Sequence, residues 1–344
     1  MSPVLRTHRL RREPASLKNL WFLRLCRSSL TPSRSKVSER FTFRNKDNIT
    51  KVKMKRKDFI MIDLHVHSNH SDGTLSPEEL VELAVKTGLS AFALTDHDTV
   101  SGIAKAKEAA ARFTADGQSV TVISGTEISA AYKKKDIHIL GLFIDETNPV
   151  LLQNLEQAVA ERGRRNEKMA ERFRALGIPL TLEELCRENP DTVITRAHFA
   201  KYLSEKNYVK TREEAFQRYL SHEAPCFVPR EYMQPEQAIS LILNAGGIPV
   251  LAHPLLYKLK PNELDSLLER LTAAGLKGLE VFYSSNTSFD ESIAYSLANR
   301  FGLLMTGGSD FHGSNKPNIH LGSGRNHNLN IPDSVLEPLL ALAK

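Results

Sequence analysis

The sequence has little cysteine, a single tryptophan and no long hydrophobic run. Three cysteines, Cys26, Cys186 and Cys226, are scattered over 344 residues without a CxxC pair. This pattern indicates neither a disulfide framework nor a zinc knuckle. No stretch approaches the roughly 18 consecutive apolar residues of a membrane span. The expectation is a soluble protein in a reducing, cytoplasmic compartment, with no membrane contact.

Motifs for covalent catalysis and for nucleotide-binding loops are also missing. The sequence contains no glycine-rich phosphate loop, no GxSxG elbow and no Cys–His pair in a recognisable context. A covalent enzyme intermediate is therefore not expected. If the chain transfers a phosphoryl group, the acceptor is expected to be water.

Positive charge is concentrated in the first sixty residues. Residues 1–60 hold 17 lysines and arginines against four acids, a net charge of +13. Because the whole chain carries +6, the remaining residues carry −7, and a broad electrostatic surface for nucleic acid is not expected there. The basic leader lacks a patterned apolar face, so we predict that it is disordered. It fits a transit-peptide-like segment, a basic RNA-binding arm, or an over-extended reading frame that starts naturally at Met54 or Met61.

Short apolar runs alternate with helical patterns from residue 61 onward, which indicates βα units and a mainly parallel sheet. The predicted strands cover residues 62–66, 91–95, 120–124, 137–144, 248–252, 278–283 and 303–307. The predicted helices between them cover residues 76–88, 101–115, 235–245, 261–274, 289–301 and 333–343. Seven strands favour a distorted α/β barrel built from two parts, residues 61–148 and 229–344.

Two stretches depart from this rhythm. Residues 127–132 and 137–143 flank a polar turn, which predicts an antiparallel hairpin that brings His138 to the same rim as Glu127. Residues 149–228 have helical patterns almost throughout. They predict a helical insertion that covers the rim as a lid, and such insertions usually set substrate choice. Its expected helices cover residues 149–176, 182–188, 196–206 and 212–220.

Imidazoles and carboxylates gather at the ends of the predicted strands, where barrel enzymes keep their active sites. His65 and His67 alternate with Val66, so both side chains point to the same face of their strand. Asp310 and His312 repeat this arrangement after the last strand. The full set of candidate metal ligands is His65, His67, Asp72, His97, Glu127, His138, His253, Asp310 and His312.

A set of nine candidate ligands exceeds what one tetrahedral ion can use, so we predict two or three divalent ions. Imidazole combined with carboxylate suits zinc, manganese or iron better than magnesium or calcium. Closely spaced ions lower the pKa of a bridging water and neutralise phosphate oxygens. The predicted reaction is hydrolysis of a phosphoester by a metal-bridging hydroxide.

The order of short motifs resembles the polymerase and histidinol phosphatase (PHP) domain over residues 61–323. The motifs are HxH, SDG (71–73), TDHDT (95–99), GTE (125–127), HILG (138–141), HP (253–254) and SDFH (309–312). The resemblance implies a distorted seven-stranded barrel, a trinuclear site filled with manganese, iron or zinc, and phosphoesterase activity. Every ligand position of the family is occupied by a matching residue, as expected of an active enzyme.

The segment Ile194–Ala200 resembles a motif of one PHP subgroup, which contains 3′,5′-nucleoside bisphosphate phosphatases and 5′-to-3′ exonucleases that trim short RNA. This implies that Arg196 and His198 bind phosphate, and that the partner is a nucleotide or a short RNA or DNA oligonucleotide. No stable protein partner is inferred. Two alternatives remain open. One is a phosphatase of a small sugar or amino-alcohol phosphate such as histidinol phosphate, and the other is a metal-stabilised nucleic-acid-binding module without catalysis.

Neighbouring polar residues provide further candidates. Asp96 is interpreted as a carboxylate that orients an imidazole, or as a loop residue, and Glu280 as a support for the site at the end of its strand. Tyr283 and Asn286 are candidates for contact with a base or a sugar. Arg230 is interpreted as a contact for a second phosphate or as surface charge.

Overall fold

A computed structural model of the chain describes residues 61–343 except 116, 134 and 230–232. The predicted disorder of residues 1–60 and the interpretation of Arg230 therefore lie outside the described residues. Within the described part of the chain, no helix has both the length and the apolar character needed to cross a membrane.

Seven strands form one sheet whose spatial order follows the sequence. They are β1 (Met61–Val66), β2 (Leu89–Leu94), β3 (Thr121–Tyr132), β4 (Lys135–Leu142), β5 (Ile248–Leu251), β6 (Gly278–Tyr283) and β7 (Leu304–Gly308). The predicted seven-stranded barrel sheet is confirmed, and the described residues also contain a short two-stranded sheet of β8 (Ile319–His320) and β9 (Gly324–Arg325) that was not predicted. The one large difference is β3, in which the predicted strand 120–124 and the first arm of the hairpin are a single continuous strand.

The sheet is parallel at both ends and antiparallel in the middle. Strands β1, β2 and β3 pair in parallel, as do β5, β6 and β7, whereas β4 runs antiparallel to both of its neighbours. In the β3–β4 hairpin, Ser129 pairs with His138. The predicted hairpin is thus confirmed, and it brings Glu127 and His138 into contact.

The sheet nearly closes into a barrel where β1 meets the segment that follows β7. Asp310 N donates to His65 O at 2.9 Å, and His67 N donates to Phe311 O at 3.0 Å. Gly308 permits this approach, because a Cβ at that position would lie 2.4 Å from His65 Cβ. The seam therefore places the first pair of predicted ligands beside the last pair.

A buried carboxylate, that of Asp63, holds the seam together. It accepts hydrogen bonds from Ser309 N and Gly322 N, each at 2.8 Å, and from the Ser309 hydroxyl at 2.5 Å. Asp63 is fully buried. A carboxylate in this position satisfies several donors that would otherwise be buried without partners.

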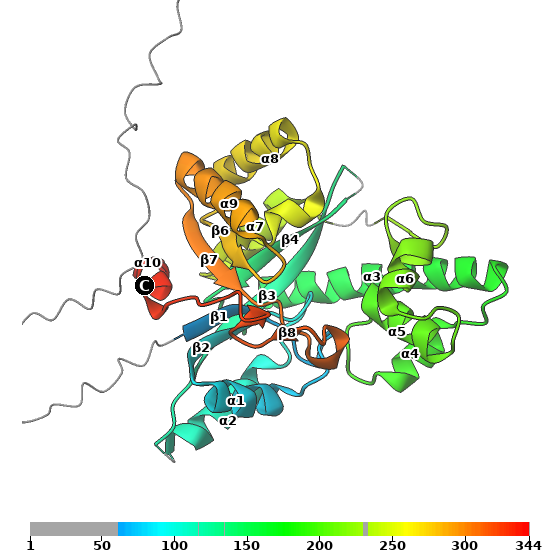
Figure 1. Ribbon diagram of the computed structural model, residues 1–344, viewed down its shortest axis with the longest axis horizontal. Coiled ribbons are helices and arrows are strands. Elements are labelled where there is room, and N and C mark those ends of the chain that lie inside the picture. The colour runs from blue at the N-terminus through cyan, green and yellow to red at the C-terminus, as the bar shows by residue number, and fades with distance from the viewer. Residues whose placement is uncertain (1–60, 116, 134, 230–232, 344) are drawn as a thin grey trace, which may run out of the picture. The chain divides into compact units, whose positions relative to one another are not determined.

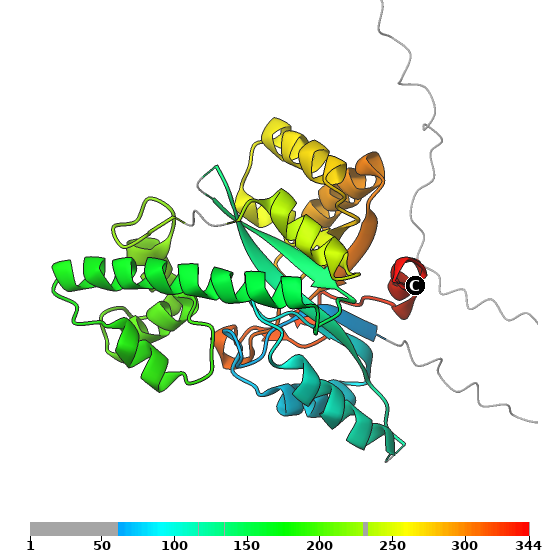
Figure 2. The same cartoon turned by 180° about the vertical axis from the view of Figure 1, so that it is seen from behind.

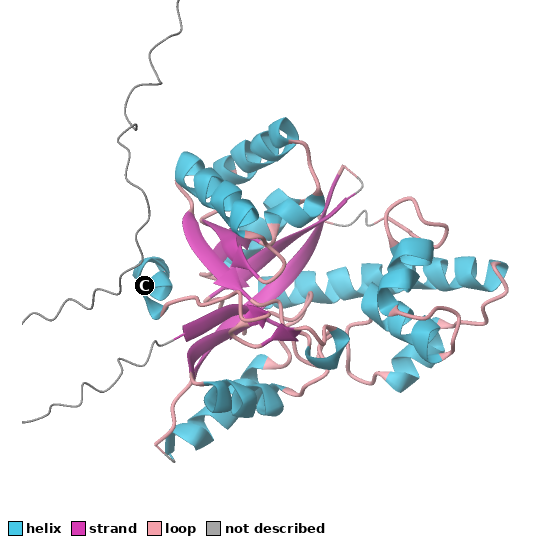
Figure 3. Ribbon diagram, viewed as in Figure 1, coloured by secondary structure: helices cyan, strands magenta, loops and turns pink. Residues whose placement is uncertain are grey.

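Helices cover the outside of the sheet in two groups, with α1 and α2 on one side and α7, α8 and α9 on the other (Figures 1 and 3). Ser76 begins α1 with a capping box, since its hydroxyl accepts from Glu79 N and its own N–H donates to the Glu79 carboxylate. The bounds are α1 (Pro77–Thr87), α2 (Ile103–Ala115), α7 (Pro235–Asn244), α8 (Pro261–Ala273), α9 (Ser288–Phe301) and α10 (Leu336–Leu342).

The insertion between β4 and α7 is helical, as predicted. Its helices are α3 (Pro149–Ala175), α4 (Leu182–Glu188), α5 (Arg196–Glu205) and α6 (Arg212–Ala215), and α6 continues as a π-helical turn, Phe216–Leu220. These helices bury a core of their own around Phe173 and Phe199. The long helix α3, bright green in Figure 2, begins beside the barrel and extends to the smaller helices.

We expect Asp63→Ala to lower the free energy of unfolding by about 2–4 kcal/mol, because the substitution leaves the donors of Ser309 and Gly322 buried and unpaired. Urea denaturation followed by circular dichroism, with a chelator present in every sample, measures this change. Asp333→Ala is the matched control, because Asp333 is exposed, and its effect should stay within about 0.5 kcal/mol. Equal stabilities of the two variants would contradict the role of Asp63.

Candidate metal centre

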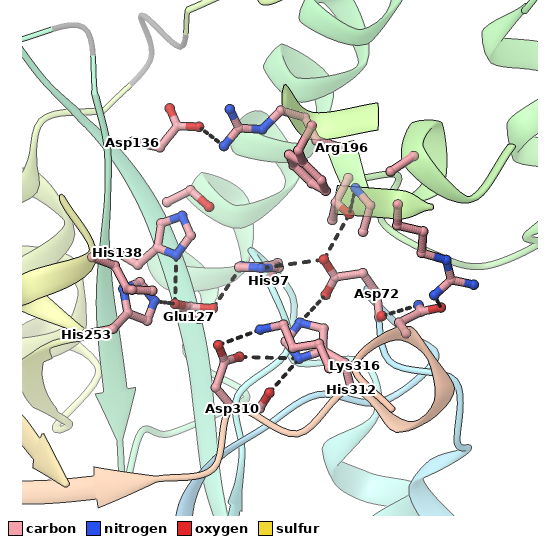
Figure 4. Close-up of a pocket in the computed structure, with 18 of the residues that line it drawn as sticks. Asp72, His97, Glu127, Asp136, His138, Arg196, His253, Asp310, His312 and Lys316 are labelled. Atoms are coloured by element: carbon pink, nitrogen blue, oxygen red, sulfur yellow. Dashed lines mark hydrogen bonds and ion pairs between the residues drawn. The ribbon is translucent and has the colours of Figure 1, made fainter. Parts of the chain in front are cut away.

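All of the predicted metal ligands come together in one cluster at the rim of the barrel. Strand β1 supplies His65, and His67 follows directly after the last residue of that strand. The hairpin of β3 and β4 supplies Glu127 and His138. Asp72, His97, His253, Asp310 and His312 come from loops that follow strands. Figure 4 shows the members outside β1 pointing toward one another. Eight of the nine residues are buried, and the side chain of His138 is 20% exposed.

The first group of donor atoms lies at the seam. His65 Nε2 and His67 Nε2 are 3.1 Å apart. Glu127 Oε2 lies 3.4 Å from the first nitrogen and 3.2 Å from the second. Asp310 Oδ1 lies 3.7 Å and 3.4 Å from the same two atoms. Two imidazole nitrogens and two carboxylate oxygens therefore converge on one small space.

A second group forms around Asp72. His312 Nε2 lies 3.1 Å from Asp72 Oδ1, and His97 Nε2 lies 3.7 Å from Asp72 Oδ2. The ring of His67 lies 4.2 Å from that of His312, measured between centroids. One ligand atom from each of these four residues lies within 4.8 Å of the others, close enough for a shared ion.

The third group surrounds Glu127 on the hairpin side. Glu127 Oε1 lies 2.8 Å from His138 Nδ1 and 3.1 Å from His253 Nε2, while its Oε2 lies 3.0 Å from His97 Nδ1. Glu127 therefore belongs to more than one group. If ions were bound, Glu127 would be a ligand in more than one of the groups.

The electrostatics of the cluster favour bound cations. Burial alone would raise the pKa of Glu127, but the surrounding imidazoles outweigh it and hold that pKa well below its usual range. Against the effect of burial, His312 holds the pKa of Asp72 well below its usual range, and Lys316 together with His312 does the same for Asp310.

Burial, together with the neighbouring His312, lowers the pKa of His67 to about 3, so its ring is neutral at pH 7. Against the effect of burial, the neighbouring carboxylates raise the pKa values of His65 and His97. Metal ions require ionised carboxylates and neutral imidazoles, so a cation bound beside these two rings would take the place of their protons.

Buried polar atoms that form no hydrogen bond also indicate that the cluster can hold cations. Asp72 Oδ1 and His97 Nδ1 are buried and form no hydrogen bond, although His312 Nε2 lies 3.1 Å from the first atom and Glu127 Oε2 lies 3.0 Å from the second. Buried polar atoms are seldom left unpaired, and a bound cation would supply the missing partner of both atoms. The donors are imidazole nitrogens and carboxylate oxygens, the set that suits manganese, iron or zinc.

Residues behind the cluster hold it in position. Glu280 Oε1 lies 2.9 Å from His65 Nδ1, which turns the Nε2 of that ring toward the cluster. Tyr283 donates its hydroxyl to Asp310 Oδ2 at 2.8 Å. The structure thus places Glu280 in the supporting position that the sequence indicates. Tyr283 contacts a predicted ligand, whereas its position in the sequence suggested contact with a base or a sugar.

Two further contacts differ from the interpretation of the sequence. Lys316 is not among the candidates that the sequence provides, yet its ammonium group lies 2.6 Å from Asp310 Oδ2. The one local signal for it is its position close after the SDFH motif. Asp96 accepts from Ser68 N at 2.8 Å and from the hydroxyls of Ser68 and Ser71 at 2.5 Å. It thus holds the loop that leads to Asp72 instead of bonding an imidazole directly.

The cluster forms the floor of a cavity of about 420 Å³, and the insertion supplies the opposite wall. Arg162, Arg165, Arg196 and Arg212 all line this wall. Arg196, the first predicted phosphate contact, pairs with Asp136 at 2.9 Å (Figure 4). The structure therefore places Arg196 at the cavity, as the proposed role requires.

His198, the second predicted phosphate contact, lies behind the wall. It is buried and does not line the cavity. Its Nδ1 accepts from Thr195 N at 3.0 Å at the start of α5, and burial lowers the pKa of its ring to about 4. Thr195 in turn donates its hydroxyl to Asp72 Oδ2 at 2.9 Å. The arrangement links the capping of α5 to the metal cluster, which sequence spacing alone did not reveal.

A nearly closed seven-stranded barrel with an acidic and imidazole-rich cluster at its rim has the architecture of a metal-dependent hydrolase. The sequence profile of the PHP domain matches residues 63–270. The chain therefore belongs to the PHP domain family, and it is a metal-dependent phosphoesterase, as the resemblance of its motifs implied.

Relatives of known name agree with this assignment. The chain is 36% identical to the 5′-3′ exoribonuclease Rnm of Escherichia coli over 253 residues, 74% of this chain and 85% of that protein. It is also 36% identical to a 3′,5′-nucleoside bisphosphate phosphatase of Chromobacterium violaceum over 254 residues, 73% of this chain and 87% of that protein. A crystal structure of a protein from Bifidobacterium adolescentis, assigned as a metal-dependent phosphoesterase, has a TM-score of 0.70 at 32% identity and covers 82% of this chain and 96% of its own.

We expect His67→Ala to lose bound metal and at least about 10²-fold of phosphoesterase activity, because His67 contributes to two of the three donor groups. Elemental analysis of protein purified without added metal measures the first effect, and steady-state kinetics the second. His327→Ala is the control, because His327 is exposed and outside the cluster. Full metal content together with full activity in His67→Ala would rule out a role for His67 as a ligand.

Proposed function

We propose that this protein hydrolyses 3′,5′-nucleoside bisphosphates and removes nucleotides from the 5′ end of short oligonucleotides. One observation carries the proposal: the metal-binding floor of the cavity faces a wall of arginines from the insertion. A floor of this kind suits the phosphate that is cut, and guanidinium groups suit its charged oxygens. The names of the two relatives, a bisphosphate phosphatase and a 5′-3′ exoribonuclease, support the same substrate class.

The proposed ligands of two or three divalent ions, with manganese favoured, are the nine residues of the cluster. Bound ions of this type lower the pKa of a coordinated water toward neutrality and offset the charge of phosphate oxygens. The protein supplies the orientation. Glu280 fixes the ring of His65, and Tyr283 fixes the carboxylate of Asp310. Both contacts restrict the donor atoms before substrate arrives.

In this proposal the insertion, residues 149–228, determines substrate choice. Arg196 has five N–H donors in a planar fork, and the pairing with Asp136 holds the fork at the cavity wall. Besides the bond from the Thr195 hydroxyl to Asp72, two bonds join the insertion to the barrel loop that carries Asp72. Val193 N donates to His70 O at 3.0 Å, and the Thr192 hydroxyl donates to Asn69 O at 2.7 Å. These bonds hold the lid in a fixed position relative to the metal cluster. We infer a cytoplasmic location, since Cys186 and Cys226 are free thiols.

The function is tested by phosphate release from adenosine 3′,5′-bisphosphate and by shortening of a 5′-phosphorylated RNA. We expect both reactions, with loss of activity after chelation and recovery on adding manganese. Histidinol phosphate serves as the comparison substrate. Turnover of histidinol phosphate alone would indicate an amino-alcohol phosphatase, and RNA binding without hydrolysis by any metal-loaded form would indicate a binding module.

We expect Arg196→Ala to keep its bound metal and to lower kcat/KM for the bisphosphate by about 5- to 150-fold, which corresponds to roughly 1–3 kcal/mol for a charged hydrogen bond. Metal analysis and initial-rate kinetics measure the two quantities. Arg187→Ala on helix α4 is the matched control, because Arg187 is exposed and does not line the cavity. Loss of metal from Arg196→Ala would instead assign Arg196 a structural role.

A further inference from the structure

We propose that Lys135 and Lys258 bind phosphate groups of an RNA chain on the 3′ side of the bond that is cut. This inference rests on the proposed function and concerns a surface of the barrel outside the cavity, at its mouth. The ligand is single-stranded RNA, whose first nucleotide occupies the cavity and whose following nucleotides lie over the two lysines. The surface would strengthen the use of oligonucleotides and leave the use of free nucleotides unchanged.

The cavity is too small to enclose an oligonucleotide. Its volume of about 420 Å³ is within the range of sites for single small molecules. An RNA that is cut at the metal cluster must therefore extend out of the cavity into solvent. Of the described residues that line the cavity, Leu256 and Glu213 are the exposed ones. These two residues mark the places where the RNA chain can leave.

Charge distinguishes the two places. Glu213 presents an exposed carboxylate, which repels the phosphates of a departing chain. Leu256 belongs to a short 3-10 helix, η2 (Pro254–Tyr257), and offers an apolar contact to a base. Lys258 comes directly after η2 and is exposed. The RNA chain is therefore expected to leave over Leu256.

The hairpin of β3 and β4 brings a second lysine to the same place. Lys135 begins β4, and its Nζ donates to Tyr257 O at 2.9 Å. That oxygen belongs to the peptide bond between Tyr257 and Lys258, so the ammonium group of Lys135 lies beside Lys258. The next residue of β4, Asp136, lines the cavity (Figure 4). The two lysines therefore lie directly outside the cavity mouth.

The positive charges of the two lysines are available to an anion. Among the described residues, neither Lys135 nor Lys258 forms an ion pair, and the oxygen that Lys135 contacts is uncharged. The adjacent carboxylate, that of Asp136, pairs with Arg196 at 2.9 Å. An ammonium group has three N–H donors, and Lys135 uses one of them on Tyr257 O. Its remaining donors can reach phosphate oxygens.

The local charge differs from that of the rest of the barrel and insertion. Residues 61–344 carry a net charge of −7, which repels nucleic acid over most of their surface. Two adjacent lysines without carboxylate partners reverse the sign at the cavity mouth. Contacts to phosphate carry no sequence information. They suit an exonuclease, because each removal of a nucleotide brings a different base to the same surface.

The test compares wild-type holoenzyme with the double variant Lys135→Gln/Lys258→Gln on a 5′-phosphorylated pentaribonucleotide and on adenosine 3′,5′-bisphosphate. kcat/KM for the RNA should fall by about 3- to 30-fold at low salt, because two exposed charge contacts are lost. The slope of log kcat/KM against log salt concentration should become shallower by about 1 to 1.5, since each phosphate contact of a single strand contributes roughly 0.7. kcat/KM for the bisphosphate should equal that of the wild type.

Lys86→Gln/Lys277→Gln is the matched control, because it removes the same charge from two exposed lysines, one on α1 and one directly before β6. All variants keep residues 1–60, so the basic leader contributes equally to every measurement. The control should match the wild type on both substrates. An RNA rate in Lys135→Gln/Lys258→Gln equal to that of the control would overturn the proposal. An equal fall for RNA and bisphosphate would overturn it as well, since the lysines would then only support the cavity wall at Leu256.

A binding measurement separates this surface from the proposed function. A pentaribonucleotide with phosphorothioate linkages and a 3′ fluorescein resists hydrolysis, so its Kd for holoenzyme, measured by fluorescence anisotropy, needs no turnover. We expect that Kd to rise by about 3- to 30-fold in Lys135→Gln/Lys258→Gln and to stay constant in the control variant. This result in a protein that hydrolyses neither substrate would contradict the proposed function and support the surface. Equal Kd values for wild type and Lys135→Gln/Lys258→Gln would overturn the surface alone.

Discussion

The carboxylate of Glu127 is the interaction on which the rest of the site depends. Its two oxygens lie within 3.4 Å of nitrogens from five imidazoles, those of His65, His67, His97, His138 and His253. These rings come from β1 and the residue that follows it, from the loop after β2, from β4 and from the loop after β5. A buried carboxylate is tolerated in such surroundings because the imidazoles around it offset its negative charge. The barrel therefore has to bring distant strands together around one side chain.

The closure of the barrel determines whether the cluster can form. The hydrogen bonds between β1 and residues 310–311 fix the last ligands beside the first. Asp63 anchors that seam through Ser309 and Gly322, and Gly308 leaves room for His65. Asp63, a structural carboxylate, and His65, a predicted metal ligand, thus lie two residues apart on the same strand. The stability of the fold and the geometry of the site are coupled at this seam.

The insertion supplies what a metal cluster alone lacks, which is a means to choose among phosphoesters. Its arginines face the cluster across the cavity, and their partners differ. Arg196 and Arg162 are matched by carboxylates, whereas Arg212 is held by neutral oxygens. Since Coulomb interactions strengthen when water is excluded, the balance of these pairs affects how anions are placed in the cavity. The arrangement of charged side chains on the lid therefore determines which substrate is chosen.

The sequence by itself determined the seven strands, the antiparallel hairpin, the helical insertion and the nine residues of the cluster, because apolar periodicity and short motifs are local patterns. Only the tertiary structure decided that Glu127 lies at the centre, that His198 caps α5 behind the cavity wall, and that Lys316 reaches Asp310. It also placed Arg212 beside Asn315, about a hundred residues away in the chain. These contacts join residues whose separation is set by strand order and lid position, which no local pattern encodes.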